Sequence, residues 1–261
     1  MTINNAVSRQ LNDSMIRIAT GQRINSAADD AAGLAISERL TAQIRGLEQG
    51  TRNVMDMQSL VNTAEGGLSN ITDSLHRIRE LSVQAAHGTL TESDRQNIQF
   101  EIDQLMQEID ATTQRTEFNT MRLLDGSFSA EDGRGLHVSA DAAGRGPTVY
   151  IGNMSTGVIM GPEPYNVVSG EFDMDRIDAA LSRVTRERAY LGAMYNRFDT
   201  TIASNQITNL NLAAARSGIR DQDIALAVME MEQLRAIEQA QLQMQRRQME
   251  QEQFPLASLL P

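Results

Sequence analysis

Residues 34–87 read LAISERLTAQIRGLEQGTRNVMDMQSLVNTAEGGLSNITDSLHRIRELSVQAAH, and their apolar side chains return in steps of four and three. The series is Leu40, Ile44, Leu47, Val54, Val61, Ala64, Leu68, Ile71, Leu75 and Ile78, with Thr51 and Gln58 as polar interruptions. This repeat is typical of a helix that buries one face against other helices. At 1.5 Å per residue the helix would be about 80 Å long. Because so long a helix needs partners along its whole length, the stretch predicts a bundle of long helices.

Three further stretches carry helical signals. After a stop at Gly88, residues 91–94 read as a helix N-cap, and Ile98, Ile102, Leu105 and Ile109 form one stripe. The short connection predicts that this helix runs antiparallel to the first. From Phe172, a stripe of Ile177, Leu181, Val184, Leu191, Phe198 and Ile202 predicts the partner of the first long helix. A final helix is expected from near Arg220 and is expected to end at Phe254-Pro255.

The middle of the chain changes pattern. Turn pairs such as Asp125-Gly126 and Asp132-Gly133 punctuate it, and residues 136–140 and 148–151 read as short strands joined by a loop at 141–147. Since an isolated hairpin is marginal in water, these strands must pack on the helices. The predicted fold is mainly α, a long antiparallel coiled-coil helical bundle with a small β-hairpin region at about 126–170.

Composition excludes several classes of function. The 261 residues carry a formal charge of −11, and every basic residue is Arg. This balance argues against a nucleic-acid partner, which requires a basic face. No apolar run is long enough to predict a membrane span. The absence of cysteine excludes disulfides and thiolate metal sites, and it fits either chance or a chain that must cross an export path without cross-links.

No residue pattern indicates chemistry. The three histidines, His76, His87 and His137, belong to no metal-binding motif, and we expect His76 and His87 on helix surfaces or helix ends. Carboxylates such as Glu80 lie beside arginines at helical spacing, which indicates a solvated face. Catalytic, cofactor-binding and metal-binding residues are therefore predicted to be none, and the chain is not expected to be an enzyme.

Several blocks resemble one family. Residues 18–36, IATGQRINSAADDAAGLAI, closely resemble the N-terminal signature of bacterial flagellins. Residues 75–84, LHRIRELSVQ, resemble the second signature, while TEFN at 116–119 and LLDG at 123–126 resemble the turn that follows. Residues 217–225, SGIRDQDIA, resemble the start of the C-terminal helix. The blocks occur in the family's order and cover nearly the whole chain.

The resemblance implies a secreted structural subunit that polymerises into the extracellular filament of the bacterial flagellum. It implies an inner coiled-coil domain from residues 1–33 and 219–261, and a rod-like helical domain at 34–218. The variable outer domains of larger flagellins would sit between about Gly161 and Gly170, so the chain resembles a minimal flagellin. Its N-terminus is expected to be short by roughly a dozen residues, about 18 Å of helix.

Two sets of residues are predicted to make subunit contacts. The packing seam comprises Leu40, Ile44, Leu47, Leu68, Leu75, Ile78, Leu181, Leu191 and Ile202. The terminal polymerisation and chaperone segment comprises Ile224, Val228, Met231, Leu234, Leu259 and Leu260. Exposed apolar seams drive association and become ordered on assembly. No cofactor is expected, and the expected partners are further copies of the chain, an export chaperone, and the junction and cap proteins of the flagellum.

The resemblance also implies a host partner. A Toll-like receptor reads one face of the middle helices in some flagellins, and the matching positions are Arg77, Leu81 and Glu101. The alternative is that Leu81 packs in the core while the two charges solvate the helices.

Two other functions fit parts of the pattern. A hook–filament junction protein shares the terminal signatures, although such proteins often carry Pro after the paired Asp, where this chain has Ala31. A flagellin-related enzyme would carry a metalloprotease insert in the variable region, and the sequence contains no HExxH motif of that kind.

Overall fold

The computed structural model describes residues 2–131, 133–169 and 172–257. The chain divides into two compact units. The terminal unit contains residues 1–44 and 210–261, and the central unit contains residues 45–209. The long helices α2 (Ala31–Ala85) and α5 (Asp175–Arg220) have residues in both units. Within the described residues, no helix combines the length and the apolar character that a membrane span requires.

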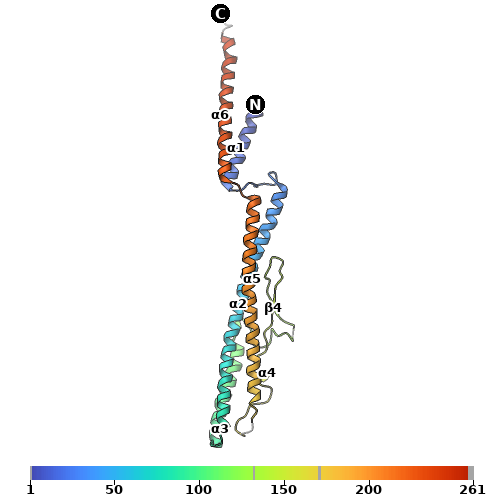
Figure 1. Cartoon of the computed structure of the whole chain (residues 1–261), viewed down its shortest axis with the longest axis vertical. Coiled ribbons are helices and arrows are strands. Elements are labelled where there is room, and N and C mark those ends of the chain that lie inside the picture. The colour runs from blue at the N-terminus through green and yellow to red at the C-terminus, as the bar shows by residue number, and fades with distance from the viewer. Residues whose placement is uncertain (1, 132, 170–171, 258–261) are drawn as a thin grey trace. The chain divides into compact units, whose positions relative to one another are not determined.

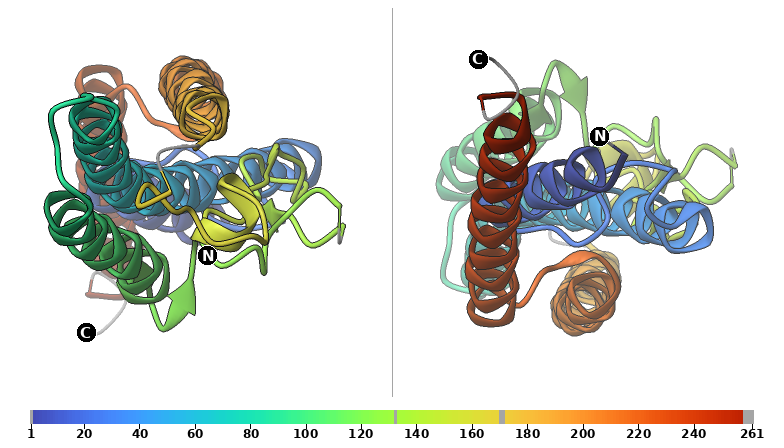
Figure 2. Two further views of the ribbon diagram at one scale, coloured as in Figure 1. Left: turned by 90° about the horizontal axis from the view of Figure 1, so that it is seen from below. Right: turned by 90° about the horizontal axis from the view of Figure 1, so that it is seen from above.

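The central unit is built on the antiparallel pairing of α2 and α5. Polar contacts join the two helices in reversed order: Arg79 with Asp178 at 2.8 Å, Glu65 with Arg188 at 2.7 Å, Gln58 with Asp199 at 2.6 Å and Thr51 with Asn205 at 3.4 Å. Helix α3 (Glu92–Arg115) turns back beside α2 (Figures 1 and 2). The prediction of a mainly helical antiparallel bundle is confirmed.

The polar interruptions of the apolar repeat have partners on the facing helix. Gln58 Nε2 donates to Asp199 Oδ1, and Asn205 Nδ2 donates to Thr51 Oγ1. Because a polar group in a helix seam is costly without a partner, these pairs disfavour other registers of α5 against α2.

Most of the predicted packing seam is buried within this one chain. The fully or nearly fully buried members are Ile44, Leu47, Leu68, Leu75, Ile78 and Leu191. Leu40, Leu181 and Ile202 are half-buried. The core around α2 also takes in Phe198 of α5 and Ile102 and Ile109 of α3.

Helix α3 begins as its sequence predicts. Thr91 Oγ1 accepts a hydrogen bond from the Asp94 N–H at 3.3 Å, and the Asp94 carboxylate accepts from the Thr91 N–H at 3.0 Å. This reciprocal capping box satisfies backbone donors that the first helical turn leaves without partners. The hydrogen bond from the Thr91 side chain also lowers the pKa of Asp94.

Two small hairpins follow α3. Strand β3 (Leu136–His137) pairs antiparallel with β4 (Thr148–Val149), which confirms the predicted hairpin with shorter strands. Strand β1 (Glu117–Phe118) pairs with β2 (Met121–Arg122), a hairpin that the sequence did not predict. Its turn residues Asn119 and Thr120 have φ of 49° and 65°. Threonine rarely adopts positive φ, so the usual turn signal is missing.

Several predicted boundaries were wrong by a few residues. The helix expected from Phe172 begins at Asp175, and Asp173 Oδ1 accepts from the Asp175 N–H at 2.9 Å. Helix α6 (Ile224–Ala257) begins after Asp223, whose carboxylate accepts from the Ala225 and Leu226 N–H groups. These carboxylates cap the helices and fix where they start. Helix α6 also continues past Phe254-Pro255, where an end was expected.

The β3–β4 hairpin rests on glycines of α2. A Cβ added at Gly50 would lie 2.4 Å from the Ala140 carbonyl oxygen, and one at Gly46 would lie 2.5 Å from Ala142 Cβ. Asn205 Nδ2 donates to the Ala140 carbonyl at 2.8 Å, which fixes the hairpin at this place. The short α4 (Thr156–Ile159) lies further along the chain, and its first N–H donates to Asp110 Oδ1 of α3.

We predict that Gly50→Ala lowers the free energy of unfolding by about 1–3 kcal/mol, because the added methyl group displaces the hairpin backbone. Thermal unfolding followed by circular dichroism measures the change. Gly66→Ala is the matched control on the same helix, since a Cβ at Gly66 meets nothing within 4 Å. The control should gain about 0.5–1 kcal/mol from helix propensity. Equal changes in the free energy of unfolding for the two substitutions would contradict the close packing of the hairpin on Gly50.

Candidate functional site

In the terminal unit, the two ends of the chain pair as helices. Helix α1 (Thr2–Thr20) packs against α6, and Ser8 Oγ donates to Glu238 Oε1 at 3.0 Å (Figure 1). The covered positions of α1 include Val7, Leu11, Ser14 and Ile18, and those of α6 are Ala227, Met231, Leu234, Glu238 and Gln241. Both sets advance in steps of four and three, which is the spacing of a coiled-coil interface. The apolar repeat of α1 was not recognised in the sequence, because Ser14 interrupts it.

A backbone junction joins the two chain ends where these helices begin and end. The Arg23 N–H donates to the Arg220 carbonyl at 2.7 Å, and the Gln222 N–H donates to the Gly21 carbonyl at 3.0 Å. Gly21 has a φ of 67°, a conformation that glycine adopts without strain. The signature glycine therefore allows the chain to leave α1 and meet the start of α6.

Side chains reinforce this junction. Arg220 donates from Nε to Gln22 Oε1 at 2.9 Å and from Nη1 to Glu38 Oε1 at 2.7 Å. Arg23 Nη2 donates to the Ile219 carbonyl at 2.6 Å. Charge-assisted hydrogen bonds of this kind are among the stronger polar contacts in proteins. The sequence analysis quoted these residues as family signatures but did not identify the contacts, because the partners lie almost the whole chain apart.

The paired aspartates of the signature have separate structural roles. Asp29 Oδ2 accepts from the Ser26 N–H at 2.8 Å and from the Asn25 N–H at 3.1 Å, and the Ser26 bond contributes most to lowering the pKa of Asp29. Asp30 Oδ1 accepts from the Gly33 N–H at 2.8 Å in the first turn of α2. The first aspartate closes the loop, and the second caps the next helix.

Helix α6 carries a second, exposed stripe beside the one that packs on α1. The stripe contains Leu226, Met229, Ile237 and Met244, which are 48%, 63%, 41% and 67% exposed, together with the exposed Gln233 and Ala240. We call these six positions the outer face of α6. Its residues also advance in steps of three and four, so they lie on one side of the helix. A helix with two apolar stripes is typical of one that is buried along both.

The structure divides the predicted terminal polymerisation segment. Met231 and Leu234 are half-buried on the side facing α1, while Ile224 and Val228 are exposed. Leu259 and Leu260 lie outside the described residues. The sequence analysis missed the outer face, although the spacing of Leu226, Met229 and Ile237 was the signal that could have revealed it.

The predicted receptor face has two exposed charges above a buried leucine. Arg77 bonds Glu101 across α2 and α3, with Nη2 2.7 Å from Oε1, and this hydrogen bond raises the pKa of the Arg77 guanidinium. Glu80 also pairs with Arg77 at 3.2 Å, as its predicted place on a solvated face suggests. Leu81 is 2% exposed and packs in the core.

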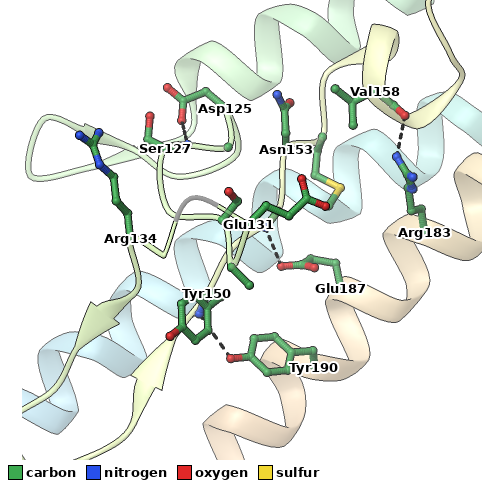
Figure 3. A pocket seen from close by; sticks show the side chains of 15 residues that line it. Asp125, Ser127, Glu131, Arg134, Tyr150, Asn153, Val158, Arg183, Glu187 and Tyr190 are labelled. Carbon is green, nitrogen blue, oxygen red and sulfur yellow. Dashed lines mark hydrogen bonds between the residues drawn. The ribbon is translucent and has the colours of Figure 1, made fainter.

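An open groove of about 820 Å³ lies beside α5 in the central unit (Figure 3). The Gly152 N–H donates to Glu187 Oε1 at 3.0 Å, and the Tyr150 N–H donates to the Tyr190 hydroxyl oxygen at 3.3 Å. These contacts hold the segment after β4 against α5. Burial raises the pKa of Glu187, while the hydrogen bond from Gly152 lowers it less strongly.

The three histidines lie apart from one another and have local surroundings. His87 hydrogen-bonds Thr89 at 2.7 Å, His137 hydrogen-bonds the Gly144 carbonyl at 3.1 Å, and His76 is exposed. Within the described part of the chain, three or more His, Asp or Glu residues do not come together in an arrangement that could hold a metal ion.

Comparison with known proteins gives two matching family models. The bacterial flagellin N-terminal helical region matches residues 1–129, and the bacterial flagellin C-terminal helical region matches residues 174–260. The flagellar filament 31.3 kDa core protein of Treponema maltophilum is 36% identical over 241 residues, covering 87% of this chain and 84% of that protein. A flagellin of Halalkalibacterium halodurans is 38% identical over 233 residues, with the same coverage of 87% and 84%.

Solved structures agree with this likeness. The crystal structure of Bacillus cereus flagellin is 28% identical, with a TM-score of 0.52, and covers 62% of this chain and 94% of that one. A protein described as flagellar hook-associated, from Vibrio parahaemolyticus, is 13% identical with a TM-score of 0.55 and covers 72% of this chain and all of that one. At 13% identity the second likeness concerns the fold alone.

We predict that Arg220→Met loosens the junction of the chain ends by about 1 kcal/mol, because it removes two charge-assisted hydrogen bonds at a partly exposed site. Hydrogen exchange read by mass spectrometry should show roughly fivefold faster exchange at the Arg23 and Gln222 amides. Arg235→Met, which removes an exposed pair with Glu232 on α6, is the matched control and should leave these amides unchanged. Unchanged exchange in Arg220→Met would show that its side chain does not support the junction.

We predict that Glu187→Gln stabilises the chain relative to wild type increasingly as pH rises from 4 to 7. The folded-state pKa of Glu187 is raised above its ordinary value of 4.5. The stability that wild type gains from protonated Glu187 is therefore fully present below pH 4.5 and is lost as pH rises through the folded-state pKa. Glutamine keeps the acceptor for the Gly152 N–H without a buried charge. The measurement is the thermal midpoint against pH, with the exposed Glu163→Gln as a control of equal charge change. Parallel pH profiles for the two variants would refute the assignment.

Proposed function

Because this chain belongs to the bacterial flagellin family, we propose that it is a structural subunit that polymerises into the flagellar filament. The observation that carries the proposal is the outer face of α6. One stripe of this helix packs on α1, and a second stripe beside it presents Leu226, Met229, Ile237 and Met244 to solvent. The second stripe requires a partner outside the chain, and we propose that this partner is another copy.

The energetics favour an extended polymer. Burial of apolar surface contributes roughly 25 cal/mol per Å², so a row of apolar side chains shared between copies offsets the cost of ordering the chain ends. A helix face that docks on a different surface of the next copy makes a heterologous contact. Where the rotation between copies does not close into a ring, such contacts continue and build a helical filament. The exposed Ile224 and Val228 extend the available apolar surface.

The two units suit this assignment. We propose that residues 1–33 and 219–261 form the inner coiled-coil domain and that residues 34–218 form the rod-like helical domain. The backbone junction at Arg23 and Arg220 supports a single terminal unit made from both chain ends. The segment between the two matched family regions, residues 130–173, holds only the β3–β4 hairpin, α4 and connecting loops among its described residues. This supports a minimal subunit without large outer domains.

A hook–filament junction protein is the less favoured alternative. The relatives that share 36% and 38% identity are a filament core protein and a flagellin, whereas the hook-associated neighbour shares 13%. A purely structural role, without catalysis, is the function we propose, since Glu187 and Tyr190 of the groove beside α5 bond the chain's own backbone. The place of action would be the extracellular filament.

Further partners are part of the proposal. An export chaperone would cover the exposed apolar residues of α6 before secretion, and junction and cap proteins would meet the chain at the filament ends. Recognition by a Toll-like receptor would use the exposed Arg77–Glu101 pair, while Leu81 would support that face from the core.

The test is polymerisation of the purified full chain in ammonium sulfate, which strengthens apolar association. Sedimentation and electron microscopy should show filaments above a critical concentration. Met229→Glu should raise that concentration about tenfold or more, because it would bury a charge on the outer face of α6. Gln239→Glu adds the same charge at an exposed position of α6 outside that face and should polymerise as wild type does.

Two results would count against the proposal. A wild-type chain that stays monomeric at every concentration contradicts the filament function. A Met229→Glu variant that polymerises normally contradicts the role of the outer face.

A further inference from the structure

The methionines of this chain differ widely in exposure. It has 14 methionines and no cysteine, so methionine carries all of its sulfur chemistry. Met154, Met160 and Met194 are at most 7% exposed in the core of the central unit. Met229 and Met244 are the two most exposed methionines among the described residues, at 63% and 67%. Both lie on the outer face of α6.

Position and chemistry together make these two thioethers distinctive. Oxidation of methionine follows exposure, and it converts a flexible apolar side chain into a polar one. On a solvated surface that change costs little. On a face that must be buried against another protein surface, each sulfoxide oxygen needs a hydrogen-bond donor. Leu226, Ile237 and Ala240 of the outer face supply none, so Gln233 is the single donor side chain available for two sulfoxides.

We infer that Met229 and Met244 are oxidation-sensitive positions at which a peroxide switches off self-association. This inference rests on the proposed function. The thioether sulfur attacks the terminal oxygen of hydrogen peroxide. A sulfur–oxygen bond forms and the oxygen–oxygen bond breaks, and proton transfer to the leaving hydroxide releases water. The sulfur is oxidised by two electrons, and the peroxide is reduced by the same two electrons.

The sensitive state is the free subunit. Before assembly both sulfur atoms are open to a small oxidant. After assembly the neighbouring copy covers them, so a completed polymer is protected while new subunits are blocked. Thiol-dependent reduction of the sulfoxides restores the original side chains and the capacity to assemble.

The first measurement is the order of oxidation in the full chain treated with hydrogen peroxide. Trypsin cuts only after Arg in this lysine-free sequence, so residues 236–246 form one peptide that contains Met244 alone. Met229 shares the peptide of residues 221–235 with Met231, and fragment masses separate the two. Met229 and Met244 should oxidise about tenfold faster than Met154, Met160 and Met194. Equal rates for the two groups would overturn the inference.

The second measurement is polymerisation after oxidation. The oxidised wild-type chain should show a critical concentration raised about tenfold, and reduction by methionine sulfoxide reductase should restore it. The double variant Met229→Leu with Met244→Leu should have the same critical concentration before and after peroxide, whatever that concentration is relative to wild type. Met15→Leu with Met55→Leu, which removes two exposed methionines elsewhere, should leave the sensitivity intact. Loss of assembly in the first double variant after peroxide would overturn the inference.

The third measurement compares reactivity in subunit and polymer. Met229 and Met244 should be protected in sedimented filaments, and undiminished reactivity there would overturn the inference. Polymerisation of the unoxidised chain distinguishes a failure of this inference from a failure of the proposed function. If the unoxidised chain fails to polymerise, both the inference and the proposed function are contradicted. If it polymerises but peroxide has no effect, only the oxidation switch falls.

Discussion

A long α-helix can bury its apolar stripe only against a partner that runs beside it, and this requirement governs both units of the chain. In the central unit, α5 runs antiparallel to α2, and α3 and the hairpins complete the cover, so Leu68, Leu75 and Ile78 are fully buried. In the terminal unit, α6 has α1 on one side only. The same physical rule therefore gives a self-sufficient core in one unit and an incomplete interface in the other.

The N-terminal signature acts through short-range geometry. Asp29 closes the loop that follows Gly21, and the buried Ile24 anchors this loop. Asp30 caps the first turn of α2. Gly33 leaves room for this loop, because a Cβ at position 33 would lie 2.5 Å from Asp30 Oδ2 and 2.7 Å from Ile24 Cδ1. These contacts position Arg23 against the other end of the chain. The pairing of the two ends thus depends on a loop of small and acidic residues.

Features with a local cause were predictable from sequence. The repeat of α2, the capping box at Thr91 and the β3–β4 hairpin each follow from neighbouring residues. The pairing of α2 with α5 was predictable too, because both carry long apolar stripes, but individual contacts between distant side chains were not. Arg220 meets Gln22 and Glu38 only in the folded chain. The β1–β2 turn was missed because Thr120 is an unusual residue at positive φ. The outer face of α6 was missed because a helix with two apolar stripes shows no single clear periodicity.

The polar links between α2 and α5 have a mechanical consequence. They are spread along the two helices from Thr51–Asn205 to Arg79–Asp178, and each one joins a residue of α2 to a residue of α5. A pulling force along the helix axes would load all of them together with the interlocked apolar side chains between them. Sliding would have to break many contacts at once, whereas peeling would break them one by one. The central unit is therefore built to resist tension along its helices better than force applied across them.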